Sequence, residues 1–211
     1  RIQDAEHGYR RMSISRGMAT WELDGDVWHE LPVTDWPSRR SGYGLAFDAQ
    51  RRRIVLFGGR DSGLGVMRDD TWELAGDDWV RREPAHAPDK RRGQAMAYDP
   101  GLGKTVLFGG VADAQDFDDT WTWDGSDWEQ VVSYGVPPRP SPVMPGVLAY
   151  HPERGQLLLI TSKSRPSSYS GLSAWWFDGG GWSNQPTDSV RGLFGPAALA
   201  WEPHRQRMVL V

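Results

Sequence analysis

The chain has 211 residues, with 25 glycines, 15 prolines, 12 tryptophans and a formal net charge of −4. This length suffices for one closed domain, and the glycine and proline content is typical of many short strands joined by turns. The negative charge provides no basic footprint for a nucleic acid, and no apolar run approaches the roughly 18 residues that span a membrane. The chain has no cysteine, which excludes disulfides and thiolate chemistry and fits either redox compartment.

The start of the chain differs from the rest. Residues 1–15 match no later segment, so we predict a non-repeat N-terminal segment followed by one domain over 16–211. Trp21 and Trp28 then begin a pattern of paired tryptophans that returns along the chain. The N-terminus is therefore expected to carry only the second half of a repeat.

Two complete repeats follow, at about 38–87 and 88–138, and a third at about 139–189 is degenerate. The complete repeats share Val-Leu-Phe-Gly-Gly, a polar loop, Asp-Thr-Trp and a second tryptophan. In the third repeat Thr161 and Ser162 replace the glycine pair, and residues 190–211 supply the first half of a further repeat. Self-similarity at a period near 50 residues indicates propeller blades.

Each repeat is predicted to form four strands and no helix. The second strand is an uninterrupted apolar run, which is typical of burial on both faces, and the glycine pair at its end allows backbones to approach closely. The third strand ends in a hairpin turn such as Asp124-Gly125. The residues that define the repeat are Gly58, Gly59, Gly109, Gly110, Trp21, Trp28, Trp72, Trp79, Trp121, Trp128, Trp175 and Trp182.

Such a sheet has two apolar faces and cannot stand alone in water. Stacking several sheets face to face around an axis buries those faces and leaves only short edges. We therefore predict that the paired tryptophans fill the space between neighbouring sheets and belong to the core. Their indole N–H groups then require hydrogen-bond acceptors.

The order of these residues resembles the kelch motif. It consists of an arginine, an apolar segment ending in Tyr-Asp or Phe-Asp, Val-Leu-Phe-Gly-Gly, Asp-Thr-Trp and a second tryptophan, and the resemblance extends over most of residues 16–211. It implies an all-β fold, a β-propeller of four-stranded blades, which kelch proteins use mostly as a binding platform.

Three complete repeats and two half-repeats allow two architectures. The halves are complementary, so they would form the closing blade of a four-bladed ring. Alternatively, the sequence is a window of a larger propeller. An open sheet edge would then need a cover, such as further residues or another subunit, which allows self-association.

The acidic and histidine residues do not form an evident metal site. Asp69-Asp70 and Asp118-Asp119 recur with the repeat and are expected to hold turns. Asp113 crowds the second loop with further aspartates, but calcium requires about six or more oxygen ligands. The histidines lack the spacing of metal ligands. We predict no metal and no cofactor.

The loops after the second strands, at 60–68, 111–118 and 161–172, differ in sequence while the frame around them repeats, which is typical of binding loops. The arginines ahead of the first strands would form an anion-attracting mouth if they converge. In the alternative interpretation, which the sequence favours, each pairs with an acidic group or a carbonyl of its neighbours. The candidate binding residues are Arg60, Asp61, Arg68, Asp113, Asp116, Lys163, Arg165, Tyr169, Arg40, Arg92, Arg139 and Arg191.

The sequence thus favours a non-enzymatic scaffold that binds a protein or a small acidic ligand through loops on one face. The alternative is a sugar-acid mutarotase or lyase with a polar cluster at the propeller mouth. Galactose-oxidase-like chemistry is excluded because it needs a cysteine. A third hypothesis is a repeat domain that spaces or caps other domains. We expect neither a nucleic-acid partner nor a membrane span, and the sequence does not indicate a cellular compartment.

Overall fold

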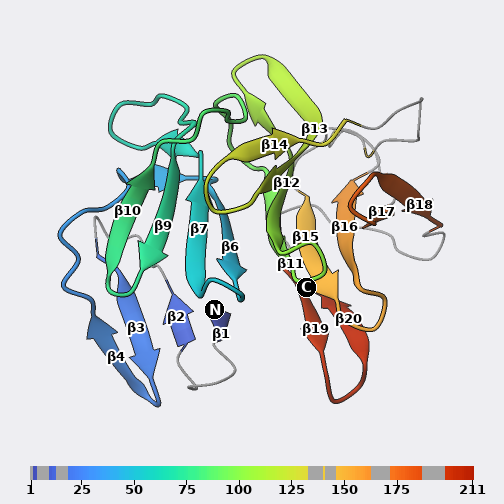
Figure 1. Cartoon of the computed structure of the whole chain (residues 1–211), viewed down its shortest axis with the longest axis horizontal. Coiled ribbons are helices and arrows are strands. Elements are labelled where there is room, and N and C mark those ends of the chain that lie inside the picture. The colour runs from blue at the N-terminus through green and yellow to red at the C-terminus, as the bar shows by residue number, and fades with distance from the viewer. Residues whose placement is uncertain are drawn as a thin grey trace.

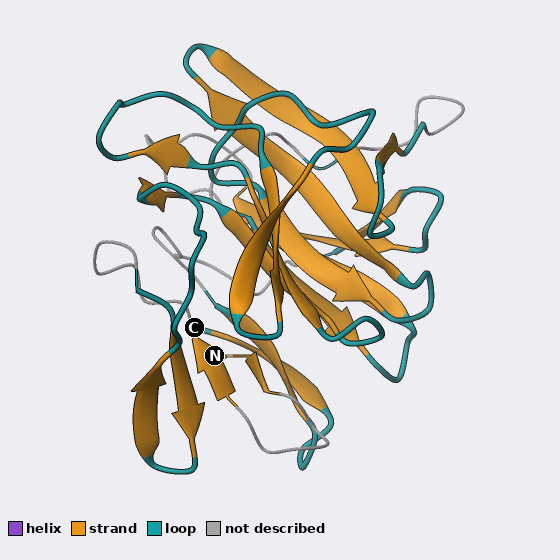
Figure 2. Cartoon of the chain, turned by 60° about the vertical axis from the view of Figure 1, so that its left-hand side comes forward, coloured by secondary structure: helices purple, strands orange, loops and turns teal. Residues whose placement is uncertain are grey.

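The computed structural model describes residues 2–3, 10–12, 19–132, 140, 146–162, 172–186 and 198–211. Within these ranges every regular element is a β-strand, which confirms the predicted all-β class (Figures 1 and 2). The same ranges contain no helix with the length and apolar character that a bilayer crossing requires. The strands form antiparallel sheets, numbered below in chain order.

The repeats form three four-stranded sheets, each with its strands in the predicted order from first to fourth. Sheet 2 contains β6 (Gly44–Asp48), β7 (Arg53–Phe57), β9 (Thr71–Ala75) and β10 (Asp78–Arg82). Sheet 3 contains β11 (Ala95–Asp99), β12 (Lys104–Ala112), β13 (Gln115–Trp123) and β14 (Trp128–Gln130). Sheet 4 contains β15 (Val147–His151), β16 (Gln156–Ser162), β17 (Leu172–Phe177) and β18 (Trp182–Gln185).

The N-terminal sheet, sheet 1, also has four strands: β1 (Ile2–Gln3), β2 (Arg10–Met12), β3 (Trp21–Asp24) and β4 (Val27–Glu30). Two of these strands come from residues 1–15, which show no repeat pattern in the sequence. β2 pairs with β3 along the edge that a half-repeat would leave open. Strand pairing uses main-chain groups that every residue except proline provides in full, so a segment without repeat residues can complete a sheet.

Among the described residues, the closing blade of the four-bladed alternative is not formed. β19 (Leu199–Glu202) and β20 (Arg207–Leu210) form a two-stranded sheet of their own, sheet 5, while β3 pairs with β2. The place that the C-terminal half would take beside β3 is therefore occupied by the N-terminal segment. The described sheets do not close into a ring.

Sheets 2 to 5 pack against one another in sequence order. Their first strands β6, β11, β15 and β19 contact one another in that order, and Figure 1 shows the sheets following in series. The core between sheets 2 and 3 contains the buried residues Val55, Phe57, Leu107 and Trp128. The core between sheets 3 and 4 contains Val106, Phe108, Leu157 and Trp182. Apolar faces are thus buried between sheets, as the uninterrupted apolar second strands require.

The second tryptophans join each sheet to the preceding one by a repeated hydrogen bond. In sheets 2, 3 and 4 the indole N–H donates to the threonine just ahead of the first tryptophan of the sheet before. The bonds run from Trp79 to Thr20 at 3.0 Å, from Trp128 to Thr71 at 2.8 Å and from Trp182 to Thr120 at 2.8 Å. Buried indoles need such partners, so the bonds fix the position of each sheet on its neighbour.

The paired tryptophans are not all buried to the same degree. Trp72, Trp79, Trp128, Trp175 and Trp182 are buried, and Trp21 and Trp121 are partly buried. Trp28 differs from the expectation because it is 36% exposed. It lies on β4, of which all four residues are exposed. The spacing of the pairs therefore predicts where each indole lies along its strand, whereas burial depends on a neighbouring sheet.

The glycine pairs stand where two backbones meet. Gly58 and Gly59 have φ angles of 66° and 97°, and Gly109 and Gly110 repeat this conformation. A Cβ at Gly58 would lie 2.7 Å from the carbonyl oxygen of Arg91. The Gly59 N–H donates to the same oxygen at 2.8 Å, and this bond keeps the two backbones close. Only glycine combines positive φ with this closeness.

Candidate functional site

The loop between β7 and β9 is held by its own hydrogen bonds. Its first part is the strand β8 (Arg60–Asp61), which pairs with β5 (Arg40–Ser41). The Asp61 carboxylate accepts the N–H groups of Gly63 and Leu64 at 2.9 Å and a bond from Arg68 at 2.6 Å. These bonds lower the pKa of Asp61, the one from Arg68 most of all. The loop is therefore ordered by an ionised carboxylate at its centre.

This ordered loop displays apolar side chains to water. Leu64 is 72% exposed and Val66 is 45% exposed, although the Leu64 N–H donates to the Asp61 carboxylate and the Val66 carbonyl accepts the Asp61 N–H. Arg60 is exposed beside them, and its Nε donates to the Gly65 carbonyl at 3.0 Å. Leu64 and Val66 were missed by the sequence analysis. Their signal in the sequence is a cluster of three apolar residues, Leu64, Val66 and Met67, in a loop whose other residues are polar or glycine.

The corresponding part of sheet 3 is different in form. β12 and β13 continue past the glycine pair as a hairpin whose tip carries Asp113, with a φ of 45°, and the exposed Asp116. Arg92 pairs with Val111 of this hairpin through backbone bonds in both directions. Figure 1 shows the hairpin tip and the β7–β9 loop at the same end of the sheets. The predicted loops of the first two repeats thus share one face.

Arg40 is one of the arginines for which the sequence left two interpretations, and its side chain pairs with neighbouring groups. It is buried and donates to the Gly58 carbonyl and, through both terminal nitrogens, to the Asp70 carboxylate. Asp70 also accepts the indole N–H of Trp72 at 2.8 Å. Burial alone would raise the pKa of Asp70, but the bonds from Arg40 and Trp72 outweigh it and lower the pKa. Arg40 thus has a structural role and stabilises the packing around Gly58 and Asp70.

The same arrangement recurs one repeat later around Arg91. Arg91 is fully buried, donates to the Gly109 carbonyl at 3.1 Å and reaches Asp119 with both terminal nitrogens. Its guanidinium lies 3.9 Å from the centre of the Phe117 ring. Asp119 accepts the indole N–H of Trp121 at 2.8 Å. This is the alternative in which the repeated arginines pair with acidic and carbonyl groups, and it holds at both described positions.

Arg92 lies next to this buried arginine and has a different environment. It is half-buried, its side chain passes 3.3 Å from where a Cβ of Gly42 would be, and its buried Nε has no hydrogen-bond partner. The Arg68 Nη2 donates to Asp61, but the buried Arg68 Nε, like the Nε of Arg92, has no hydrogen-bond partner. Of the predicted arginines within the described residues, Arg60, Arg68 and Arg92 therefore keep donor groups that the frame does not use.

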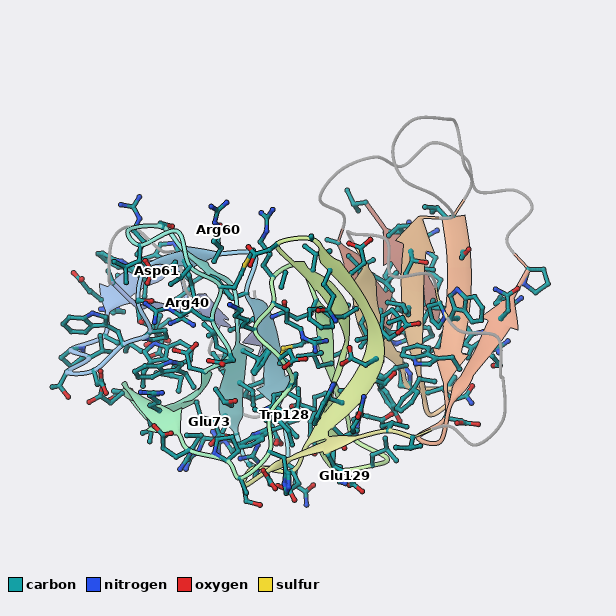
Figure 3. The ribbon with its side chains drawn as sticks, turned by 90° about the horizontal axis from the view of Figure 1, so that it is seen from above. Arg40, Arg60, Asp61, Glu73, Trp128 and Glu129 are labelled. Carbon is teal, nitrogen blue, oxygen red and sulfur yellow. The ribbon has the colours of Figure 1, made fainter. Side chains whose placement is uncertain are left out.

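Glu73 is a buried carboxylate that the sequence analysis did not single out. Glu73 is 0% exposed and accepts bonds from Arg51 at 2.6 Å, from Arg82 at 2.9 Å and from the indole N–H of Trp123 at 2.9 Å. Burial would raise the pKa of Glu73, but these bonds lower it. Figure 3 places Glu73 away from Arg60 and Asp61, on the opposite side of the view. Both carboxylate oxygens of Glu73 accept hydrogen bonds from neighbouring side chains, so Glu73 stabilises the packing of sheets 2 and 3.

The remaining predicted residues give no further site in the described part of the chain. Arg139, Lys163, Arg165, Tyr169 and Arg191 lie outside the described residues. Among the residues that the structure describes, no group of three or more His, Asp or Glu side chains is arranged to hold a metal ion. The candidate site is therefore the face formed by the loop at 60–68 and the β12–β13 hairpin tip.

Comparisons with known proteins do not assign this chain. No protein-family model matches it, and no curated protein is significantly similar in sequence. Arguments about its function consequently start from the residues of the loop face.

Proposed function

We propose that this chain is a non-enzymatic scaffold of the kelch β-propeller type and that it binds a protein segment through the face carrying the loop at 60–68. The four-stranded sheets packed in sequence order and the repeated tryptophan–threonine bonds support the assignment to propeller blades. In this proposal the frame positions the loops, and the loops make the contacts.

One observation carries the proposal. The loop at 60–68 is ordered by the bonds to Asp61, and it nevertheless holds Leu64 72% exposed. Because the main chain that carries Leu64 is already ordered, binding does not have to order it, and more of the free energy of burying the side chain contributes to affinity. Arg60 adjoins it, and arginine is enriched in the residues that dominate protein interfaces.

The test is a selection of displayed random peptides on the immobilised chain. Selected peptides are then measured by calorimetry against the unaltered protein, a Leu64→Ser/Val66→Ser variant and a control variant, Val80→Ser. Val80 is also an exposed aliphatic residue, but it lies on β10, away from the loop. We expect the double variant to bind at least about tenfold more weakly, which corresponds to roughly 1.4 kcal/mol, and the control to bind normally.

Both variants change exposed side chains, so their unfolding midpoints should stay close to that of the unaltered protein. Failure to select any peptide would contradict the proposal. So would peptides whose affinity is the same for the double variant and the control.

A further inference from the structure

The loop at 60–68 has an electrostatic character that narrows the choice of partner. The charges of Arg68 and Asp61 neutralise each other, because Arg68 donates to the Asp61 carboxylate at 2.6 Å. Arg60 then remains as an exposed cation, and the exposed Arg39 joins it since the Ser62 N–H donates to the Arg39 carbonyl at 2.8 Å. The loop that carries the aliphatic pair thus contains one exposed arginine, Arg60, and is bonded through its main chain to a second, Arg39.

The Arg60 side chain is also partly fixed. Its Nε donates to the Gly65 carbonyl at 3.0 Å, so the guanidinium is anchored at one nitrogen and its two terminal nitrogens are left for another acceptor. Figure 3 shows this side chain pointing away from the ribbon. A planar fork held in this way matches a carboxylate, which accepts two parallel N–H bonds.

Acidic residues near the loop limit how far a negatively charged partner can extend along this face. Asp69 is exposed where the loop returns to sheet 2, and Asp113 and Asp116 are exposed on the neighbouring hairpin tip. The chain as a whole carries a net charge of −4. A long polyanion would meet these aspartates, whereas a short acidic segment need only reach Arg60 and Arg39. Charge complementarity therefore favours a peptide with localised acidity over a nucleic acid.

We propose that the partner segment is an acidic peptide that places an apolar residue against Leu64 and Val66 and a carboxylate on the terminal nitrogens of Arg60, with Arg39 attracting its flanking negative charge. This inference rests on the proposed function and specifies the chemistry of its partner. The aliphatic contact and Arg60 both contribute to affinity, and the exposed arginines also select acidic sequences and accelerate association.

The experiment compares two displayed peptide libraries of the same design, one with Asp and Glu and the other with Lys and Arg at the charged positions. Peptides from each are measured by calorimetry against the unaltered chain, Arg60→Gln, Arg39→Gln and the control Arg81→Gln. Arg81 is an exposed arginine on β10, outside the loop face. We expect binders from the acidic library alone, about tenfold weaker binding to Arg60→Gln, a smaller loss for Arg39→Gln and none for Arg81→Gln.

Salt and a competing anion complete the experiment. Affinity should fall when the ionic strength rises from about 50 mM to about 500 mM, because the rim charges are exposed to solvent. A single-stranded oligothymidylate at the peptide concentration should not displace the peptide, and displacement would overturn the inference in favour of a general anion site. Binders from the basic library, or acidic binders insensitive to Arg60→Gln, would also overturn it while leaving the proposed function standing. If neither library yields a binder, both proposals fall.

Discussion

Replacing Trp128 with alanine is expected to lower the free energy of unfolding by about 3 to 5 kcal/mol. Trp128 is 1% exposed, packs edge-on against Phe57 of sheet 2 with ring centres 5.2 Å apart, and donates its indole N–H to Thr71. Truncation removes this packing, opens a cavity between two sheets and leaves the Thr71 hydroxyl without its donor. Urea unfolding followed by circular dichroism measures the change.

Trp28 provides the matched control, because it occupies the same repeat position and is 36% exposed. Trp28→Ala should cost clearly less than Trp128→Ala, since less buried area is lost and no indole bond to a neighbouring sheet is broken. Trp128→Phe keeps most of the ring packing but removes the donor, and its expected cost is about 1 to 2 kcal/mol. Equal costs for the two alanine variants would contradict the account of how the sheets dock.

Replacing Arg91 with methionine is the second large expected effect, with a loss of about 3 to 5 kcal/mol. Arg91 is fully buried and donates to the carbonyls of Asp89 and Gly109 and to the Asp119 carboxylate. Methionine fills part of the volume but leaves a largely buried carboxylate without its counter-ion. Thermal and urea unfolding of the purified variant measure the loss.

The neighbouring Arg92→Met change is the control, because it replaces the same residue type one position along. Arg92 is half-buried and leaves its Nε unpartnered, so its loss should cost less than about 1 kcal/mol. The pair of variants separates a frame arginine from one that the frame does not use. If Arg91→Met unfolds at the same urea concentration as Arg92→Met, the structural role assigned to Arg91 is wrong.

Much of the frame is predictable from sequence because it depends on local repetition. The glycine pair, the apolar second strand and the tryptophan spacing each constrain the backbone or the core at a fixed position, so Gly58 and Trp79 lie where the pattern places them. The pairing of repeated arginines with acidic groups was one of two interpretations that the sequence allowed. Choosing between them required the geometry of Arg40 against Asp70 and Gly58.

Other features depend on contacts that no local pattern encodes. β1 and β2 complete sheet 1 by backbone pairing, although their residues show no repeat. Glu73 has no acidic counterpart in the next repeat, where Thr122 stands, and its partners Arg51 and Trp123 come from the β6–β7 turn and from β13. Leu64 is exposed because of the turn that Asp61 caps. In the sequence, a leucine at this position cannot be distinguished from a core residue.

The frame and the loop face divide the arginines between them. Arg40 and Arg91 repeat, are buried and hold glycine carbonyls and aspartates. Arg60 has no counterpart at the next glycine pair, where Val111 stands, and it is exposed. The repeated Arg40 and Arg91 are therefore structural residues, whereas the unrepeated, exposed Arg60 is a candidate contact residue.

The most direct test of the serial docking of the sheets is hydrogen exchange of the indole N–H groups, followed by NMR on ¹⁵N-labelled protein. Trp79, Trp128 and Trp182 donate to threonine hydroxyls of the preceding sheet, so their indole protons should exchange at least about a hundredfold more slowly than that of Trp28. Similar exchange rates for all four indoles would contradict the docking of each sheet on the one before it.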